Sequence, residues 1–264
     1  EFRRVLFRSK SQHNRPHQFI KHLSQKNDVT VISVNDWWKG KQGDLESYSS
    51  DFNDFLSKID YYYLTEKEVS PFIQEVLFTN HAESMNEVLN EDYDIHLNYN
   101  SLIMGYKISK RFKTVFDLAD DIPAMIRHSP QIPSFLRPFG SLMGKYYLKK
   151  NVNVSDFVTI TTPQLIENIK IPEDKIRVIP NGVDSKTFRF HKNAKEKLGL
   201  NGIFLGYVGV LREWVDFKPI FEAMTSISTE IKFLIVGSEG NLIKTKELVK
   251  NYNLNDRVIF TGMI

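Results

Sequence analysis

The sequence has no cysteine. This absence excludes disulfide bonds, thiolate nucleophiles, zinc fingers and iron–sulfur clusters, and it favours a reducing, cytoplasmic compartment. No apolar run approaches the ~20 residues that are needed to span a bilayer. The 35 basic and 32 acidic residues nearly balance. We therefore expect no nucleic-acid partner, because a dedicated nucleic-acid binder needs a concentrated basic face.

Several catalytic signatures are also missing. No H-E-x-x-H motif occurs, and no metal site is expected. The absence of G-x-S-x-G disfavours an α/β-hydrolase. Neither G-x-G-x-x-G nor G-x-x-x-x-G-K-[ST] is present, so dinucleotide dehydrogenases and P-loop enzymes lose their main support.

The remaining composition is that of a globular protein, with 41% hydrophobic and 25% charged residues in 264. That length allows one large domain or two of roughly 100–150 residues. Residues 1–9 look like a translated linker or assembly scar and are left out of the fold prediction, with a first strand at residues 5–7 as the alternative. An apolar run at 258–260 lies close to the last residue, Ile264, so we expect a piece of a longer protein.

Short β-rich runs alternate with helical patterns along the chain. Strands are predicted at 28–34, 61–64, 93–98, 113–118, 156–161, 175–179, 203–210, 231–236 and 257–260. Helices are predicted at 16–25, 101–111, 142–150, 217–225 and 242–252, with a polar loop between 118 and 142 and a short helix after Pro163.

The alternation breaks at Pro180-Asn181-Gly182, which is strong turn chemistry, and a polar, basic stretch then runs to Lys197. Alternating strands and helices predict parallel sheets with helices on both faces. We therefore predict an α/β fold of two Rossmann-like domains, residues 10–184 and residues 185–264, with the second domain incomplete.

Ligands of open α/β sheets bind beyond the carboxyl ends of the strands, so residues that follow a strand are the candidates for a site. Asp117, Asp120 and Asp121 end or follow the strand at 113–118. Carboxylates placed there can orient sugar hydroxyls, bind a metal or act as a general base. Helix capping in a solvated loop is the alternative for the same residues.

Three further places are candidates, two after strands and one before a helix. Gly209 allows close backbone approach and Arg212 can clamp a phosphate, although a surface arginine is the alternative. Residues 237–241 form a glycine loop before a helix, which suits an anionic ligand. Asn14 and Arg15 lie at the start of the first helix, where capping is the alternative to ligand contact.

Residues 135–150 mix basic and aromatic side chains. Two interpretations stay open: the segment packs on its own domain, or it rests on an anionic membrane surface as a peripheral contact.

Residues 178–184 read Val-Ile-Pro-Asn-Gly-Val-Asp and are followed by Phe188. This segment resembles the inter-domain segment of retaining glycosyltransferases of family GT4, which have the GT-B fold. Residues 206–209, 233–240 and 255–262 look like the first three strands of the donor-binding domain of that family. The resemblance covers roughly residues 11–264.

The resemblance implies a transferase that moves a sugar from a nucleotide diphosphate sugar to a glycan, lipid or other acceptor, with retained configuration and without a metal or other cofactor. It further implies a role in cell-envelope glycans, in the cytoplasm or at the inner face of the membrane. The first domain is then the acceptor side, and the second holds the donor. The donor-binding candidates are Gly209, Arg212, Gly237, Glu239, Gly240 and Gly262.

By the same resemblance, Asp120 and Asp121 are the catalytic candidates. Asn14, Arg15 and Asp117 face the acceptor side. Catalysis in such a site rests on positioning and electrostatics, which stabilise an oxocarbenium-like centre and the departing diphosphate.

The chain departs from the family pattern in several places. Val210 stands where the family has arginine, no lysine follows before Lys218, and the family's first glycine-rich loop and E-x7-E region are absent. The 264-residue chain is therefore expected to be weakly active or inactive by itself. A non-catalytic nucleotide- or sugar-binding module on the same scaffold is the alternative function, and a sugar-nucleotide epimerase is the third hypothesis.

Overall fold

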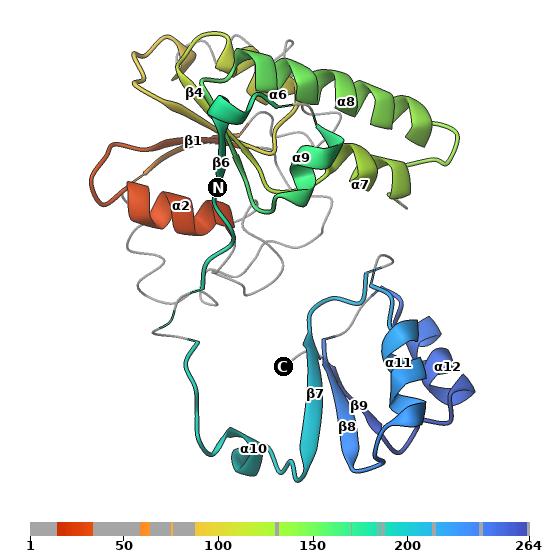
Figure 1. The fold of residues 1–264 in the computed structure, drawn as a ribbon. Coiled ribbons are helices and arrows are strands. Elements are labelled where there is room, and N and C mark those ends of the chain that lie inside the picture. The colour runs from red at the N-terminus through yellow and green to blue at the C-terminus, as the bar shows by residue number, and fades with distance from the viewer. Residues whose placement is uncertain are drawn as a thin grey trace. The chain divides into compact units, whose positions relative to one another are not determined.

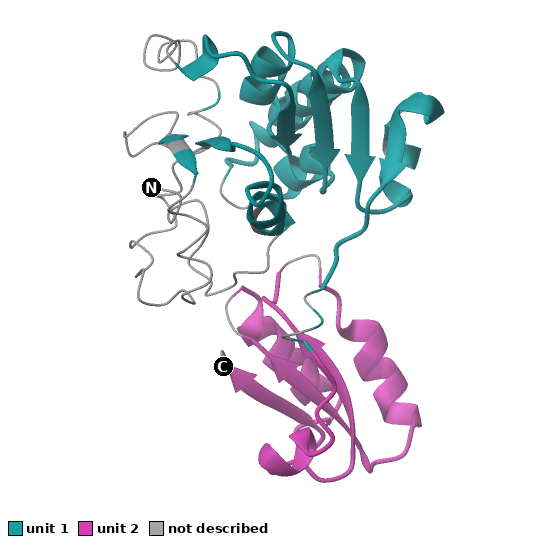
Figure 2. Cartoon of the chain, turned by 90° about the vertical axis from the view of Figure 1, so that its left-hand side faces the viewer, with its two compact units in different colours: residues 1–188 teal, residues 189–264 magenta. Residues whose placement is uncertain are grey.

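The protein divides into two compact units, residues 1–188 and residues 189–264 (Figure 2). The observed boundary lies four residues beyond the predicted one, which follows residue 184. The structure is a computed structural model, and it describes residues 15–33, 59–63, 75, 88–129, 132–169, 171–183, 185, 188–212, 215–237 and 240–262. None of the helices within those ranges is both long and apolar enough to cross a bilayer.

The described residues of unit 1 form two parallel sheets. The first pairs β1 (Thr30–Ser33) with β2 (Asp60–Tyr63). The second has the order β3 (His96–Tyr99), β4 (Thr114–Leu118), β5 (Phe157–Ile160) and β6 (Ile176–Val178). These short runs are rich in β-branched and aromatic residues, and their parallel pairing confirms the predicted α/β class.

The described part of unit 1 contains α2 (Arg15–Leu23), α6 (Ile103–Ser109), α7 (Ile122–His128), α8 (Arg137–Val154), α9 (Gln164–Asn168) and the 3-10 turn η4 (Glu173–Lys175). From α6 onward these helices connect successive strands of the four-stranded sheet. Figure 1 shows α6 and α8 along the same side of the four-stranded sheet, as right-handed crossovers between successive strands require. The core between them is built on the fully buried side chains of Phe116, Leu118, Val158 and Ile160.

The predicted polar loop between 118 and 142 was wrong, because α7 and the first residues of α8 occupy it. Pro123 and Pro138 lie in the first turns of these helices, where proline loses no hydrogen bond and its fixed φ is helical. The short helix α10 (Ala194–Lys197) likewise lies within the predicted connecting stretch.

Unit 2 has the parallel strand order β7 (Ile203–Val208), β8 (Ile231–Val236) and β9 (Val258–Gly262). Its helices α11 (Lys218–Ser226) and α12 (Leu242–Asn251) lie together on one face of this sheet (Figure 1). An aromatic cluster of Phe217, Phe221 and Phe233 forms the core, with ring centroids 5.9–6.1 Å apart.

His96 on β3 makes the stability of unit 1 sensitive to acid. Its Nδ1 lies 3.3 Å from the hydroxyl oxygens of Thr114 and Ser109, and burial lowers the pKa of His96 from 6.5 to about 4. Between pH 6.5 and pH 4 the imidazole of His96 is protonated in the unfolded chain but stays neutral in the folded chain. The free energy of unfolding therefore falls as the pH drops through this range. The loss is expected to be on the order of 3 kcal/mol.

Urea denaturation across this pH range measures the effect. In His96→Asn the stability of unit 1 should change much less over the same window. His128→Asn, at an exposed histidine, is the matched control. A wild-type slope that His96→Asn leaves intact would show that other groups carry the acid sensitivity.

Candidate functional site

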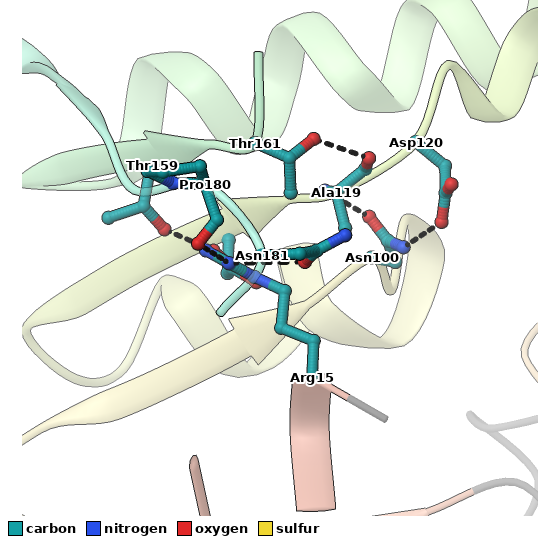
Figure 3. Close-up of polar contacts among 9 residues, drawn as sticks. Arg15, Asn100, Ala119, Asp120, Thr159, Thr161, Pro180 and Asn181 are labelled. Atoms are coloured by element: carbon teal, nitrogen blue, oxygen red, sulfur yellow. Dashed lines mark hydrogen bonds and ion pairs between the residues drawn. The ribbon is translucent and has the colours of Figure 1, made fainter. Parts of the chain in front are cut away.

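A buried ion pair lies at the carboxyl end of β4. Asp117 is fully buried in that strand, and Arg15 at the start of α2 binds it with two hydrogen bonds, Nε to Oδ2 at 2.8 Å and Nη2 to Oδ1 at 2.7 Å. The hydrogen bond from Arg15 to Asp117 raises the pKa of the guanidinium. Figure 3 shows Arg15 rising from its helix into the cluster of polar groups at the sheet edge. The pair therefore joins α2 to the end of the four-stranded sheet.

The same pair is held by β5 and by the segment that follows β6. The Thr159 hydroxyl donates a hydrogen bond to Asp117 Oδ1. Arg15 Nη1 donates to the carbonyl oxygen of Pro180 at 3.3 Å and lies 3.5 Å from Asn181 Oδ1. The Pro-Asn-Gly turn, identified in the sequence as a break between domains, is thus tied to the carboxyl edge of the sheet in unit 1.

Asn100 organises the loop that follows β4. Its side chain accepts the N–H of Ala119 at 2.9 Å and donates to Asp120 Oδ2 at 2.9 Å (Figure 3). Asn100 has a φ of 51°, a left-handed conformation that asparagine tolerates better than most residues. The Thr161 hydroxyl donates to the carbonyl oxygen of Ala119 at 2.9 Å. Groups from the ends of β3 and β5 therefore fix the direction of the exposed Asp120 carboxylate.

Asp121 and Tyr99 complete this edge. The Asp121 side chain accepts the N–H of Ala124 at 3.1 Å and caps α7, as the capping alternative predicted. Burial and the negative charges of Asp120 and Asp117 raise the pKa of Tyr99 to about 12. Tyr99 is therefore a neutral phenol at physiological pH and retains its proton as a hydrogen-bond donor.

Glycines gather at the carboxyl ends of the strands in unit 2. Gly209 follows β7, Gly237 follows β8, Gly240 precedes α12, and Gly262 ends β9. All four have φ between 65° and 154°. A Cβ on Gly237 would overlap the carbonyl oxygen of Gly209, and one on Gly240 would overlap that of Leu211. Only glycine fits these two positions, because neighbouring backbone occupies the space of a side chain.

Backbone hydrogen bonds join the segments that follow β7 and β8 and the end of β9 into one rim. Gly209 N–H donates to the carbonyl oxygen of Val236 at 2.9 Å, Gly237 N–H to that of Gly262 at 2.8 Å, and Asn241 N–H to that of Leu211 at 2.8 Å. The helix α12 begins at this rim, and the amino end of a helix carries partial positive charge. The rim therefore combines close backbone approach with a potential that favours an anion.

The structure places the predicted residues in two groups. Arg15, Asp117, Asp120 and Asp121 meet at the carboxyl edge of unit 1, and Gly209, Arg212, Gly237, Gly240 and Gly262 lie at or beside the rim of unit 2. Arg15 and Asp117 form an ion pair with each other. Asn14 and Glu239 lie outside the described residues.

Sequence reasoning missed several residues of the unit 1 edge: Tyr99, Asn100, Thr159, Thr161 and Asn181. Thr161 ends a predicted strand, and Tyr99, Asn100 and Asn181 come shortly after one, whereas Thr159 lies inside the predicted strand at 156–161. The rule that singled out the aspartates would have reached all of them except Thr159 if it had been applied to every strand of the sheet.

Residues 188–264 match the family of glycosyl transferases group 1. This match covers unit 2 and one residue before it. No curated protein sequence matches the chain significantly.

Solved structures resemble the whole chain. The crystal structure of Anabaena Alr3699/HepE in complex with UDP has a TM-score of 0.61 at 17% sequence identity, over 97% of this chain and 67% of that one. The same protein in complex with UDP-glucose gives a TM-score of 0.59 at 18% identity, over 98% of this chain and 68% of that one. This chain therefore spans about two thirds of the length of HepE and has its fold.

Proposed function

We propose that this chain forms the acceptor-side domain and part of the donor-binding domain of a retaining glycosyltransferase that uses a nucleotide diphosphate sugar. The observation that carries the proposal is the rim of unit 2, whose residues also match the family of glycosyl transferases group 1. The likeness to HepE, which binds UDP and UDP-glucose, adds support from the fold.

The rim takes the diphosphate of the donor in this proposal. The phosphates lie against Gly209, Gly237 and Gly240, where the absence of side chains lets the backbone approach them, and the amino end of α12 offsets their charge. Arg212 follows the first glycine loop and supplies a cation to the same group. No metal is part of this arrangement.

The reaction breaks the bond between the anomeric carbon and the diphosphate oxygen and forms one to an acceptor hydroxyl oxygen. The acceptor proton leaves with the departing diphosphate or passes to a base, and positive charge develops at the anomeric carbon. Asp120 is the exposed carboxylate of unit 1 that Asn100 fixes in direction, so we assign it the stabilising or basic role. The Asp121 carboxylate caps α7, which gives it a structural role besides the catalytic one suggested by its position.

Ligand binding tests the proposal directly. Thermal shift with UDP, GDP and NAD should show stabilisation by one of the two nucleoside diphosphates and none by NAD. Stabilisation by NAD alone would favour the epimerase hypothesis, and no response to any of the three would contradict a donor site in unit 2.

Asp120→Asn should lower the rate of sugar transfer by about 100-fold while nucleotide binding is retained, because the substitution removes only the carboxylate charge. Mass-spectrometric detection of transfer from a nucleotide sugar measures it, with this chain and with a longer protein that contains it. Asp94→Asn is the matched control, since Asp94 is an exposed carboxylate just before β3, at the opposite end of the strand. Equal turnover of the Asp120 variant and the wild type would remove Asp120 from the mechanism.

A second candidate function rests on Val210, which stands where the family has arginine. Without that cation the scaffold is a nucleotide- or sugar-binding module that does not catalyse transfer. Nucleotide binding without turnover in the longer protein would favour this second function.

A further inference from the structure

The segment from Asp121 to Asp156 has an unusual charge pattern. Between these two aspartates no acidic residue occurs, although the chain as a whole has 32 acidic and 35 basic residues. The basic residues of the segment are Arg127, Arg137, Lys145, Lys149 and Lys150. The segment comprises α7 and α8, which pack against each other along one side of unit 1 (Figure 1).

The first half of α8 exposes large apolar residues and buries small ones. The buried side of the helix carries small or polar residues, namely Gly140, Ser141, Gly144 and Asn151, together with Leu148 and Val152. Its outer side carries large apolar residues: Phe139 and Leu142 are each 67% exposed and Tyr146 is 56% exposed. A helix that only covers its own sheet buries its large apolar side chains.

The inner contacts explain why these large residues are not needed for packing. A Cβ on Gly140 or Gly144 would lie 3.0–3.2 Å from the side chain of Ile126, so the glycines let α8 approach α7 closely. Asn151 accepts a hydrogen bond from Asn98 at 2.9 Å and donates to the carbonyl oxygen of Leu102 at 2.8 Å. Close backbone approach and this buried amide hold the helix in place.

The outer residues form one continuous face. Phe139, Leu142 and Tyr146 are spaced three and four apart and lie on the same side of the helix. Lys145 and Lys149 are exposed beside them, and Lys150 Nζ lies 5.3 Å from the centre of the Tyr146 ring. Phe135, 78% exposed just before the helix, extends the apolar row. We call these residues the α8 face.

We propose that the α8 face binds the surface of an anionic phospholipid bilayer, with α8 lying in the plane of the interface. The apolar side chains enter the boundary between headgroups and acyl chains, and the lysine ammonium groups stay at the level of the lipid phosphates. This surface belongs to unit 1 alone and does not depend on the proposed donor site in unit 2.

The charge pattern favours a bilayer over a second copy of this chain. In a symmetric dimer the same face meets itself, so Lys145 and Lys149 would face lysines of the other copy, with no acidic residue of α7 or α8 to neutralise them. Anionic lipid headgroups supply the missing negative charge over the whole face.

Co-sedimentation with vesicles tests the proposal. The chain should bind vesicles of phosphatidylcholine mixed with phosphatidylglycerol at least about tenfold more strongly than pure phosphatidylcholine, and high salt should weaken the binding. Reversing charges in Lys145→Glu/Lys149→Glu should lower the partition coefficient by more than about 20-fold, since each lysine contributes about fivefold. Phe139→Ser/Leu142→Ser should lower it by a similar factor.

Matched controls distinguish binding through the α8 face from a general effect of surface charge or surface hydrophobicity on vesicle binding. Lys192→Glu/Lys197→Glu makes the same charge change in unit 2, and Phe190→Ser removes an aromatic side chain that is 90% exposed. Both should bind vesicles like the wild type. All the substituted residues are exposed, so circular dichroism melting should be unchanged in every variant.

Two results would overturn the proposal. One is vesicle binding that does not distinguish the anionic from the neutral lipid or the α8 variants from the controls. The other is a dimer in analytical ultracentrifugation that Phe139→Ser/Leu142→Ser abolishes, without vesicle binding by the wild type, which would assign the face to contact between copies.

Discussion

Asp117→Ala is expected to lower the free energy of unfolding of unit 1 by about 3–5 kcal/mol. The substitution leaves the Arg15 guanidinium, whose side chain is 7% exposed, without its two carboxylate hydrogen bonds. It also leaves the Thr159 hydroxyl without its acceptor. Urea denaturation followed by circular dichroism measures the loss, and hydrogen exchange of the β4 and β5 amides locates it in unit 1.

Two further variants separate the ion pair from the loop beside it. Asp120→Ala removes an exposed carboxylate and one hydrogen bond to Asn100, so its cost should stay near 1 kcal/mol. The apolar replacement Arg15→Met/Asp117→Leu should recover much of the stability lost in Asp117→Ala, because no buried charge is left unpaired. If Asp117→Ala costs less than about 1 kcal/mol, the pair is not structural, and Asp117 returns as a candidate for acceptor contact.

Gly237→Ala is the second substitution with a large expected effect. The added Cβ overlaps the carbonyl oxygen of Gly209, and the φ of 138° is strained for any residue with a side chain. The cost should be roughly 3 kcal/mol or more in the stability of unit 2. Because the new methyl group pushes the loops after β7 and β8 apart, stabilisation by UDP or GDP in thermal shift should be lost as well.

Gly206→Ala in β7 is the matched control, since a Cβ there meets no atom within 4 Å and the residue has no positive φ. Its stability should change by less than 1 kcal/mol, and nucleotide stabilisation should be retained. A Gly237→Ala protein that melts like the Gly206→Ala protein would contradict the close approach of the two loops.

The strands were predictable because their signal is local. Residues 113–118, 156–161 and 231–236 are short apolar or β-branched runs bounded by polar turns, and the structure has β4, β5 and β8 there. The helices α7 and α8 were harder to predict, because proline ends a helix in its interior but suits its first turn. The sequence around Pro123 and Pro138 is compatible with either a loop or the start of a helix, and packing against the sheet selects the helix.

The candidate site was likewise predictable only in part. The rule that ligands bind beyond strand ends reached Asp120 and the glycines of unit 2, because that rule needs only the strand boundaries. It could not assign Asp117, whose partner Arg15 is 102 residues away in the chain. It also could not separate the capping role of Asp121 from a catalytic one, because both use the same carboxylate at the same position.

The α/β class, the parallel strand alternation and the glycine turns could be predicted from the amino-acid sequence alone, because each follows from the backbone preferences of neighbouring residues. Three features required the three-dimensional packing: Arg15 neutralises Asp117, Asn100 fixes the direction of Asp120, and α8 turns Phe139, Leu142 and Tyr146 outward. The physical reason is that these outcomes depend on which distant groups share one desolvated space, and helical or strand periodicity carries no information about that.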